Sequence, residues 1–453
     1  MSQNERDSFQ SRIGLLLATV GSAVGLGNIW RFPYTLGANG GAAFLLIYIF
    51  CTLLLALPVM VAEFYIGRHS KRNAVGSFRA LVPGTAWKGV GFIGVFAAFF
   101  ILGFYYVVSG WTLEYVFQSF TSSFSNKSVE AFHSEFTAFS TTVWKPVFWT
   151  VVFIGITHAV VSVGVKNGIE RAAKFLMPLL FTILIILCIR SVTLPGAMAG
   201  LEFLFRPDFS KITSSVLISA MGQAFFSLSV GMGCMITYSS YFKDKVNLQR
   251  TALEVTLIDT FLAVLAGIMI IPAVFSFGIA PTEGPKLVFI TLPNVFGMMP
   301  LSNVWSAIFF VLLAVAALTS TISLHEVATA YLHEEHKVSR KRATWLVSGG
   351  VGVMAIISSL SFGVLKEMTL FGLTFFDVLD YTTTKLMLPF GGMLICLFVG
   401  WRIDKKILKA ELTNKGTVPF YFFTSYCFLI RYIAPLGIVL IFLNELGLLK
   451  FLK

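Results

Sequence analysis

Charged side chains are scarce in this sequence of 453 residues: Asp, Glu, Lys and Arg make up 12%, while hydrophobic residues make up 56%. Soluble domains carry about 25% charged residues, so this composition excludes an ordinary soluble protein and predicts a polytopic membrane protein. The five cysteines all fall within apolar segments and lack the paired loop spacing of a disulfide framework. We therefore interpret them as small buried hydrophobic side chains.

The signs of an enzyme or a nucleic-acid-binding protein are also missing. No nucleophile–base pair, metal-ligand cluster or phosphate-binding loop lies in an apolar segment. The basic residues are dispersed over many short loops, with no polar stretch long enough to fold as a domain that holds a duplex. The His-Glu-Glu-His run at residues 333–336 could hold a metal, but a solvated helix end is the simpler interpretation. The polar N-terminus has no apolar stretch of the signal-peptide kind, so we expect none.

Eleven apolar segments are long enough, at about 20 residues, to cross a membrane as helices. They cover approximately residues 12–37, 41–69, 88–123, 145–164, 168–192, 213–241, 247–278, 302–336, 341–362, 373–401 and 417–447. Loops on one side carry most of the lysines and arginines, and the positive-inside rule makes this side cytoplasmic. Because the number of spans is odd, we expect a cytoplasmic N-terminus and an external C-terminus.

The most informative stretch interrupts the first segment at residues 21–33, Gly-Ser-Ala-Val-Gly-Leu-Gly-Asn-Ile-Trp-Arg-Phe-Pro. Glycine costs roughly 1 kcal/mol relative to alanine in a helix interior, and arginine at bilayer depth costs at least about 2.5 kcal/mol. Unwound backbone is tolerated in a membrane only where it is buried in protein or lines a wet cavity. A kinked packing helix would explain the small residues but not Asn28 and Arg31. The stretch therefore predicts a broken helix that forms an ion and substrate site.

A second interruption lies in the sixth segment, where residues 222–233 contain glycines, hydroxyls and the amide of Gln223. If five helices form one unit and the next five another, both units begin with a broken helix, and the second is inverted. Paired interrupted segments are typical of inverted-repeat transporters. We predict one transporter domain over residues 1–453, with repeat one at about 12–192, repeat two at about 213–401 and an additional helix at about 417–447.

Polar side chains inside other segments indicate where a cation could bind. Thr319 and Ser320 lie in the eighth segment, and hard cations take oxygen ligands. Taken alone, these hydroxyls are better explained by bonds to carbonyls of their own helix. Asp259 is a carboxylate deep in the seventh segment, and a bound cation is its expected partner. Glu63, in the second segment, is better explained as an acceptor for the exposed amides of a broken helix.

These motifs resemble the bacterial branch of the neurotransmitter:sodium symporter family over essentially the whole chain. The matching stretches are residues 21–33, 39–41, 105–106, 223–229, 318–320 and 376–380. The resemblance implies an all-α polytopic membrane protein with the five-plus-five inverted-repeat fold of the leucine transporter, broken first and sixth helices, an eleventh helix and no twelfth. It also implies a sodium-coupled symporter, in a bacterial inner membrane, that takes up hydrophobic, bulky or aromatic amino acids by alternating access.

The resemblance further implies two sodium sites and one substrate site. The first sodium would be held by Ala23, Asn28, Ser227, Asp259 and the substrate carboxylate. The second would be held by Gly21, Val24, Ala316, Thr319 and Ser320. The substrate would be bound by Ala23, Gly25, Leu26, Gly27, Leu102, Tyr106, Phe226, Ser227, Ser229, Met232, Ser320, Ser323 and Leu324. In this assignment, the amides of Leu26 and Gly27 and the Tyr106 hydroxyl meet the carboxylate, as the helix-end dipoles favour.

Gating residues follow from the same resemblance. Arg31 and Asp380 would form the outer gate with Phe226 as its lid, and Arg6 and Glu334 would form the inner gate. In the fifth segment, Gly168 and Pro178 would let the helix unwind toward the cytoplasm, because proline removes a helical hydrogen bond and glycine lowers the cost of opening.

Two positions depart from better-known members of the family. Asp259 stands where chloride-dependent members have Asn, so a fixed negative charge replaces chloride and we expect chloride-independent transport. Met232 stands where the leucine transporter has Phe, which gives a more adaptable pocket wall. The expected partners are an amino acid, two sodium ions and the bilayer, without a further cofactor and without nucleic acid.

Two other classes remain as alternatives to a symporter. A channel of the same architecture is disfavoured because the polar groups form compact clusters rather than a continuous pore lining. A membrane enzyme is disfavoured because the apolar segments hold no recognisable catalytic group.

Overall fold

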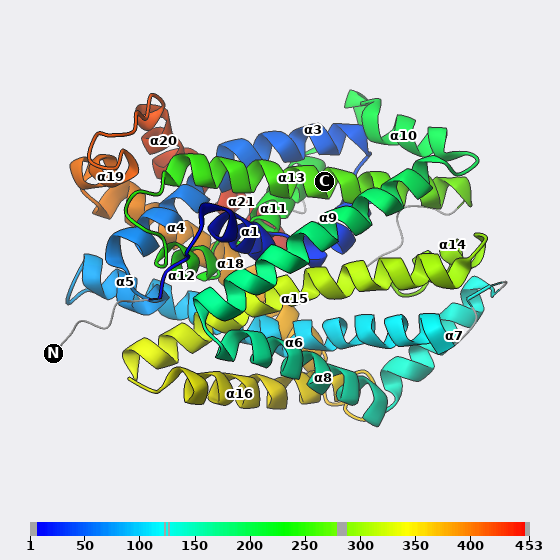
Figure 1. Ribbon diagram of the computed structural model, residues 1–453. Helices are drawn as coiled ribbons and strands as arrows, with labels where there is room; N and C mark the ends of the chain where they lie inside the picture. Colours follow the sequence, from blue (N-terminus) through cyan, green and yellow to red (C-terminus); the bar gives the residue numbers. More distant parts are fainter. Residues whose placement is uncertain (1–6, 122–123, 126, 279–287, 449–453) are drawn as a thin grey trace.

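The computed structural model describes residues 7–121, 124–125, 127–278 and 288–448 (Figure 1). Within these residues the chain is helical, apart from turns, loops and one isolated bridge between Leu370 and Leu373. The predicted all-α class is therefore confirmed.

The helices of the first half of the chain correspond to the first five predicted segments and to the connections between and after these segments. They are α1 (Arg12–Ala23), α2 (Phe32–Ala38), α3 (Ala42–Cys51), α4 (Leu57–Ser70), α5 (Ala74–Leu81), α6 (Lys88–Thr121), α7 (Val129–Thr141), α8 (Trp144–Ser162), α9 (Glu170–Val192) and α10 (Ala197–Phe205). The remaining helices are α11 (Ser214–Ser227), α12 (Cys234–Ser239), α13 (Leu248–Ser276), α14 (Thr291–Gly297), α15 (Ser302–Glu335), α16 (Arg340–Leu360), α17 (Phe375–Asp380), α18 (Leu388–Leu397), α19 (Lys405–Leu412), α20 (Phe423–Phe428) and α21 (Ala434–Glu445).

Several spans contain a π-helical turn that joins two α-helical pieces. These turns are Gly27–Arg31, Thr52–Ala56, Val165–Ile169, Tyr381–Met387, Phe398–Arg402 and Leu429–Ile433. A π-turn shifts the hydrogen-bond ladder by one residue, and such turns are frequent at functional sites. Three of them, Gly27–Arg31, Val165–Ile169 and Tyr381–Met387, include or adjoin residues for which the sequence predicts sodium binding, unwinding or gating.

Nine helices of the described residues are long and apolar enough to cross a membrane, and α1 with α2 makes a tenth span bent by 52°. The sixth predicted segment is divided into α11 and α12, of 14 and 6 residues, which are each too short to cross alone. The eleven predicted segments thus correspond to nine continuous spans and two broken ones. The prediction that the first and sixth segments are the broken ones is confirmed.

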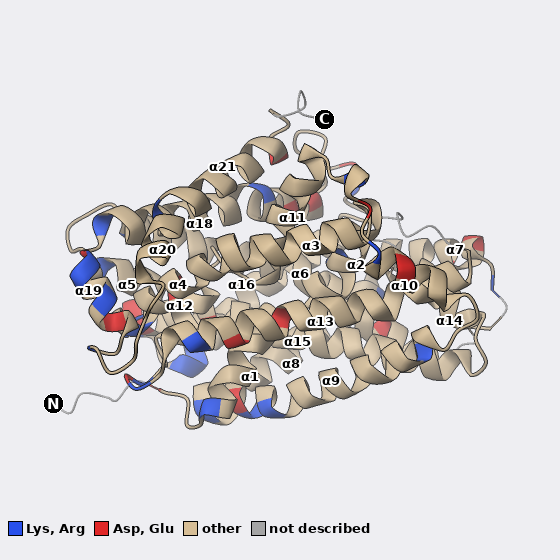
Figure 2. Cartoon of the chain, turned by 90° about the horizontal axis from the view of Figure 1, so that it is seen from above, with Lys and Arg blue, Asp and Glu red and all other residues tan. Residues whose placement is uncertain are grey.

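The long helix α15 lies inside the bundle, where it packs on α6, α9 and α16 (Figure 1). In its most apolar window, 78% of the residues are buried, the highest share among these spans. Basic residues gather at the end of the bundle that carries α5 and α19 (Figure 2). This end holds the loops to which the sequence assigns the cytoplasmic side.

The cysteines and the His-Glu-Glu-His run are placed much as expected. All five cysteines are free; four are buried and Cys427 is half-buried. Residues 333–336 form the end of α15, and no group of three or more His, Cys, Asp or Glu side chains in the described ranges could hold a metal. The interpretation of this run as a helix end is confirmed.

Candidate functional site: two broken helices that face each other

The first break follows directly from the glycines of the motif. Helix α1 ends at Ala23, and Val24 takes an extended conformation with ψ of 117° before the π-turn Gly27–Arg31 begins. A Cβ atom at Gly25 would lie 2.2 Å from Ser320 Oγ and 3.0 Å from Tyr105 Oη. A side chain at position 25 would collide with α15 and α6, because the unwound backbone passes directly against both helices. Glycine is therefore required there.

The second break needs glycine for a different reason. Between α11 and α12, Gly231 and Gly233 have φ of 86° and 76°, in the left-handed region that only glycine adopts without strain. The Gly231 amide donates to Glu63 Oε1 at 2.6 Å. The interpretation of Glu63 as an acceptor for the amides of a broken helix is confirmed, and it ties α4 to the break.

The side chains predicted to hold the first sodium lie together. The Asn28 amide donates to Asp259 Oδ1 at 2.9 Å, and the Ser227 hydroxyl donates to Asp259 Oδ2 at 2.6 Å. Tyr48 of α3, which the sequence did not single out, donates to Ser227 Oγ at 3.1 Å. Ala23 is buried at the C-terminal end of α1. The chain thus gathers a carboxylate, an amide and hydroxyls at the point where both broken helices meet α13.

The residues predicted to hold the second sodium also meet, on the other side of α1. The hydroxyls of Thr319 and Ser320 each donate to the Val24 carbonyl at 3.3 Å. Thr319 also donates to the Ala316 carbonyl at 2.9 Å, so the bond within its own helix and the bond across to α1 coexist. A Cβ atom on Gly21 would lie 3.4 Å from Thr319 Cβ, which places this glycine against the same cluster.

The tyrosine at the predicted substrate site is Tyr105 and not Tyr106. The Leu26 amide donates to Tyr105 Oη at 3.1 Å, whereas Tyr106 packs toward α8, with its ring centroid 6.4 Å from that of Phe153. Adjacent residues of a helix point about 100° apart, so only one of the two tyrosines can reach α1. This corrects the assignment of Tyr106 to the carboxylate site.

The orientation of α6 that turns Tyr106 away from α1 also turns Leu102 away, because Leu102 lies one turn from Tyr106 on the same face. Gly94 contacts the backbone of Met232 and Gly233, so the face of α6 toward the breaks carries residues 94, 98, 101 and 105. By this spacing Ile101, and not Leu102, lies on the face of α6 toward the breaks.

The other predicted substrate residues surround the two breaks. Phe226 covers Gly27, where a Cβ atom would lie 2.7 Å from its ring. The Ser229 hydroxyl donates to the Ser22 carbonyl at 3.0 Å and so joins the two breaks directly. Met232 and Leu324 are buried, and the Ser323 hydroxyl donates to the Ser320 carbonyl at 2.8 Å. An apolar wall thus lies next to the polar backbone of the breaks.

The residues predicted to form the outer gate lie beside one residue that the sequence did not indicate. Arg31 lies over the Phe226 ring, with Cζ 4.4 Å from the centroid, but it is not within ion-pair distance of Asp380 in the described structure. Glu445 of α21 lines the same cavity as Arg31 and Phe226, and it forms an ion pair with Lys385 at 3.2 Å. Only the fold brings the end of α21 to this gate, so no sequence motif pointed to Glu445.

The predicted inner gate pairs Arg6 with Glu334. Arg6 lies outside the described residues, so only the surroundings of Glu334 are given. Glu334 Oε2 accepts from the backbone amide of Asn73 at 2.8 Å. Gly168 lies within the π-turn Val165–Ile169, pressed against the Val160 carbonyl, and Pro178 lies inside α9. The helix predicted to unwind is therefore already irregular where the glycine stands.

Glu170 is a further inner residue that the sequence analysis missed. Its carboxylate accepts from the Gln10 amide at 2.8 Å and from the Ser11 hydroxyl at 2.8 Å, and it pairs with Lys174 at 2.7 Å. These bonds fasten the start of α1 to the first turn of α9.

The geometry agrees with the comparison to known proteins. The model of the sodium:neurotransmitter symporter family matches residues 6–137 and 122–452 of this chain. The chain belongs to this family. It is 40% identical over 451 residues to the uncharacterized sodium-dependent transporter YhdH of Bacillus subtilis (strain 168), a match that covers 100% of both chains. It is 35% identical to an uncharacterized sodium-dependent transporter of Haemophilus influenzae, covering 98% of this chain and 99% of that one.

Among solved structures, MhsT in complex with L-phenylalanine matches with a TM-score of 0.89 and 45% identity, over 97% of this chain and 100% of that chain. The resemblance based on motifs is therefore confirmed, and so is the leucine-transporter fold class. This symporter is a sodium-dependent transporter rather than an enzyme, and sodium is the ion that it carries.

Proposed function

We propose that this symporter carries hydrophobic, bulky or aromatic amino acids into the cell together with two sodium ions. The observation that carries the proposal is the position of the first break, whose Leu26 amide lies at the Tyr105 hydroxyl and whose Gly25 lies against Ser320. The substrate carboxylate is expected at these donors. Position 25 holds glycine and so offers no carboxylate to pair with the amine of a substrate that lacks a carboxyl group. A zwitterionic amino acid brings its own carboxylate and therefore fits best.

The ends of the broken helices support this polarity. The C-terminal ends of α1 and α11 present carbonyls, which carry partial negative charge and favour cations. The amides at the start of the π-turn Gly27–Arg31 carry partial positive charge and favour the carboxylate. We assign the amine to the carbonyls of Ala23, Phe226 and Ser227. The buried Ile101, Met232 and Leu324 would enclose an apolar side chain.

The two oxygen clusters are the proposed sodium sites. In the first, Ala23, Asn28, Ser227 and Asp259 surround the ion with the substrate carboxylate. In the second, Gly21, Val24, Ala316, Thr319 and Ser320 form a shell of neutral oxygens. Because Asp259 already places a negative charge in the first site, transport is expected to be independent of chloride.

Alternating access would use the two ends of the bundle in turn. We propose Phe226, Arg31 and Asp380 as the outer gate, and Glu334 with Arg6 as the inner one. The end with α5 and α19 faces the cytoplasm of a bacterial inner membrane, because its loops carry most of the basic residues. The whole chain would act as one transporter domain with two inverted repeats.

Uptake of radiolabelled phenylalanine into proteoliposomes tests the proposal. Uptake should depend on an inward sodium gradient and should be competed by tryptophan and leucine, but not by dopamine or serotonin. Equal competition by the amines would contradict the substrate class. Flux that follows the amino acid gradient alone, without coupling to sodium, would indicate a channel instead.

Removal of the Ser320 hydroxyl should weaken the second sodium site. A bond to a charged group contributes about 1.5–3 kcal/mol, so Ser320→Ala should raise the sodium concentration for half-maximal uptake roughly tenfold or more. The matched control is Thr321→Val on the neighbouring residue, whose hydroxyl faces Thr157 of α8. An unchanged sodium requirement in Ser320→Ala, with normal expression, would count against the second site as assigned.

Removal of the Glu170 charge should open the cytoplasmic end more often. The Glu170→Gln side chain would bind Ser11 and Lys174 less strongly, so the start of α1 should leave α9 more easily. We expect a longer distance between spin labels at Asp7 and Lys166 in the sodium-free protein. Glu130→Gln, on α7 at the far end of the bundle, is the control. Identical distance distributions in wild type and Glu170→Gln would contradict a latch role for Glu170.

A further inference from the structure

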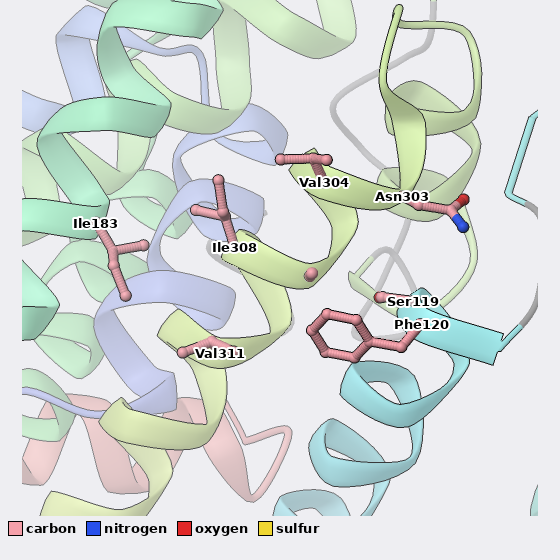
Figure 3. A pocket seen from close by; sticks show the side chains of 8 residues that line it. Ser119, Phe120, Ile183, Asn303, Val304, Ile308 and Val311 are labelled. Atoms are coloured by element: carbon pink, nitrogen blue, oxygen red, sulfur yellow. The ribbon is translucent and has the colours of Figure 1, made fainter.

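An apolar groove of about 510 Å³ lies between α6, α9 and α15, far from the two breaks (Figure 3). Its walls are Phe120 of α6, Ile183 of α9, and Ala307, Ile308 and Val311 of α15. The groove's volume is within the range of roughly 300–1,000 Å³ that is usual for small-molecule sites. These helices are candidate membrane spans, and Phe120 is 75% exposed, so the groove opens at a surface of the bundle that the bilayer would cover.

The groove lies at the end of the bundle away from the basic loops, close to the membrane surface. Ser119 is in the last turns of α6, and Asn303 and Val304 are in the first turn of α15, so the polar side chains stand at the outer end of the groove. Ile308 and Val311 lie deeper, on the next turns of α15 (Figure 3). The groove is therefore polar where it meets the surface and apolar toward the interior of the bilayer.

A cation stands at the same end. Arg190 lies two turns after Ile183 on α9, which brings it to the same helix face and about 10 Å nearer the surface. Its Cζ atom is 5.5 Å from the ring centroid of Trp305, which follows Val304 on α15. The Trp305 indole donates to the Pro300 carbonyl at 3.1 Å, which holds the ring in place beneath the arginine. Arg190 forms no ion pair with any carboxylate of the described ranges.

We propose that this groove binds one acyl chain of an anionic phospholipid, with the headgroup phosphate at Arg190. The apolar walls match a hydrocarbon chain, and the Arg190 guanidinium, which has no carboxylate partner among the described residues, matches a phosphate, which arginine can bind through two parallel hydrogen bonds. Basic pockets between membrane helices are a recurrent way to hold anionic headgroups. Trp305 lies at the level where tryptophan is enriched in membrane proteins, so the headgroup and the ring would share the interface.

Other occupants fit the groove less well. A zwitterionic amino acid needs an acceptor for its amine, and the described residues that line the groove include no carboxylate. A second copy of the chain would have to insert an apolar side chain between α9 and α15 and would leave Arg190 without an anion. The phospholipid alone matches the apolar wall, the opening toward lipid and the isolated cation.

Native mass spectrometry of the delipidated, full-length transporter with added phosphatidylglycerol or phosphatidylcholine tests the site. We expect one phosphatidylglycerol to remain bound to the wild type at a detergent concentration that removes phosphatidylcholine. Ala307→Phe, which fills the groove, and Arg190→Gln, which removes the cation, should each reduce this occupancy at least fivefold. Ile186→Phe, which places a phenylalanine at a lipid-facing position of α9 outside the groove, and Arg206→Gln, which removes another exposed cation at this end, should leave it unchanged.

Each of the other outcomes would overturn the proposal. Equal retention of the two lipids by the wild type would show that Arg190 does not select the headgroup. Unchanged occupancy in Arg190→Gln, or in an Ala307→Phe protein that elutes as a single species, would place the lipid elsewhere. If Ala307→Phe does not fold, Arg190→Gln with its Arg206→Gln control still decides. A dimer that disappears in Ala307→Phe without any bound lipid would assign the groove to a second copy instead.

Discussion

Uptake by the Asp259→Asn variant is expected to need roughly ten to a hundred times more sodium than the wild type for half-maximal rate. Asp259 is fully buried, and both carboxylate oxygens are directed by hydrogen bonds from Asn28 and Ser227 toward the point where the broken helices meet. A bond to a charged group contributes about 1.5–3 kcal/mol, and each 1.4 kcal/mol corresponds to a factor of about ten in affinity. Asp259→Asn removes a fixed charge from the first site, whereas Ser320→Ala removes a neutral ligand from the second, so the sodium requirement should rise at least as much in Asp259→Asn as in Ser320→Ala.

The measurement is uptake of radiolabelled phenylalanine as a function of sodium, with chloride present or replaced by gluconate. The wild type should transport equally well in both media, because its counter-charge is part of the chain. Asp208→Asn, an exposed aspartate in the loop before α11, is the control and should behave as the wild type. Collapse of wild-type uptake in gluconate would overturn the assignment of Asp259 as the built-in charge. One turn along α13 stands Ala263, which offers no ligand for chloride, so we expect little rescue of Asp259→Asn by that ion.

The fold and the two breaks could be predicted because a membrane makes irregular backbone expensive. Glycines, an amide and an arginine in the middle of an apolar segment are tolerated only where the chain uses them, so residues 21–33 and 222–233 identify both breaks. Glu63 followed from the same physics, since unpaired amides in lipid need an acceptor and a buried carboxylate supplies one. These inferences rest on local chemistry, which the sequence contains in full.

Residues that meet only through packing could not be found in the same way. Glu445 reaches the cavity beside Arg31 and Phe226 because α21 packs beside α11 and α18, and Glu170 accepts a hydrogen bond from Ser11 across 159 positions of sequence. Both carboxylates lie near the ends of predicted spans, 168–192 and 417–447, where a charged side chain is ordinary, so their setting did not mark them as functional. Tyr48 likewise looks like a packing residue until α3 is placed against α11, where its hydroxyl meets Ser227. The rotation of a helix about its own axis could not be predicted either. Tyr105 and Tyr106 look equivalent in the sequence until the structure shows which face of α6 points toward α1.

Tyr105→Phe is expected to raise the amino acid concentration for half-maximal uptake roughly tenfold or more, while Tyr106→Phe should stay within about twofold of the wild type. The two variants remove the same atom from neighbouring residues, so each is the matched control of the other. Tyr105 Oη accepts from the Leu26 amide at 3.1 Å and stands beside Ser320, where the carboxylate is expected. Loss of a hydrogen bond to a charged group costs about 1.5–3 kcal/mol, which sets the expected factor.

The sodium requirement separates a substrate contact from a general disturbance of the site. Tyr105→Phe should weaken amino acid binding in saturating sodium, because its hydroxyl belongs to neither proposed sodium shell. Tyr106 packs against Phe153 of α8, so its hydroxyl is too far around the helix to reach the substrate carboxylate. The reverse pattern, with Tyr106→Phe impaired and Tyr105→Phe normal, would mean that α6 turns by about 100° when the amino acid binds. Such a rotation would break the contact of Gly94 with Met232 and Gly233, which packs α6 tightly on the second break.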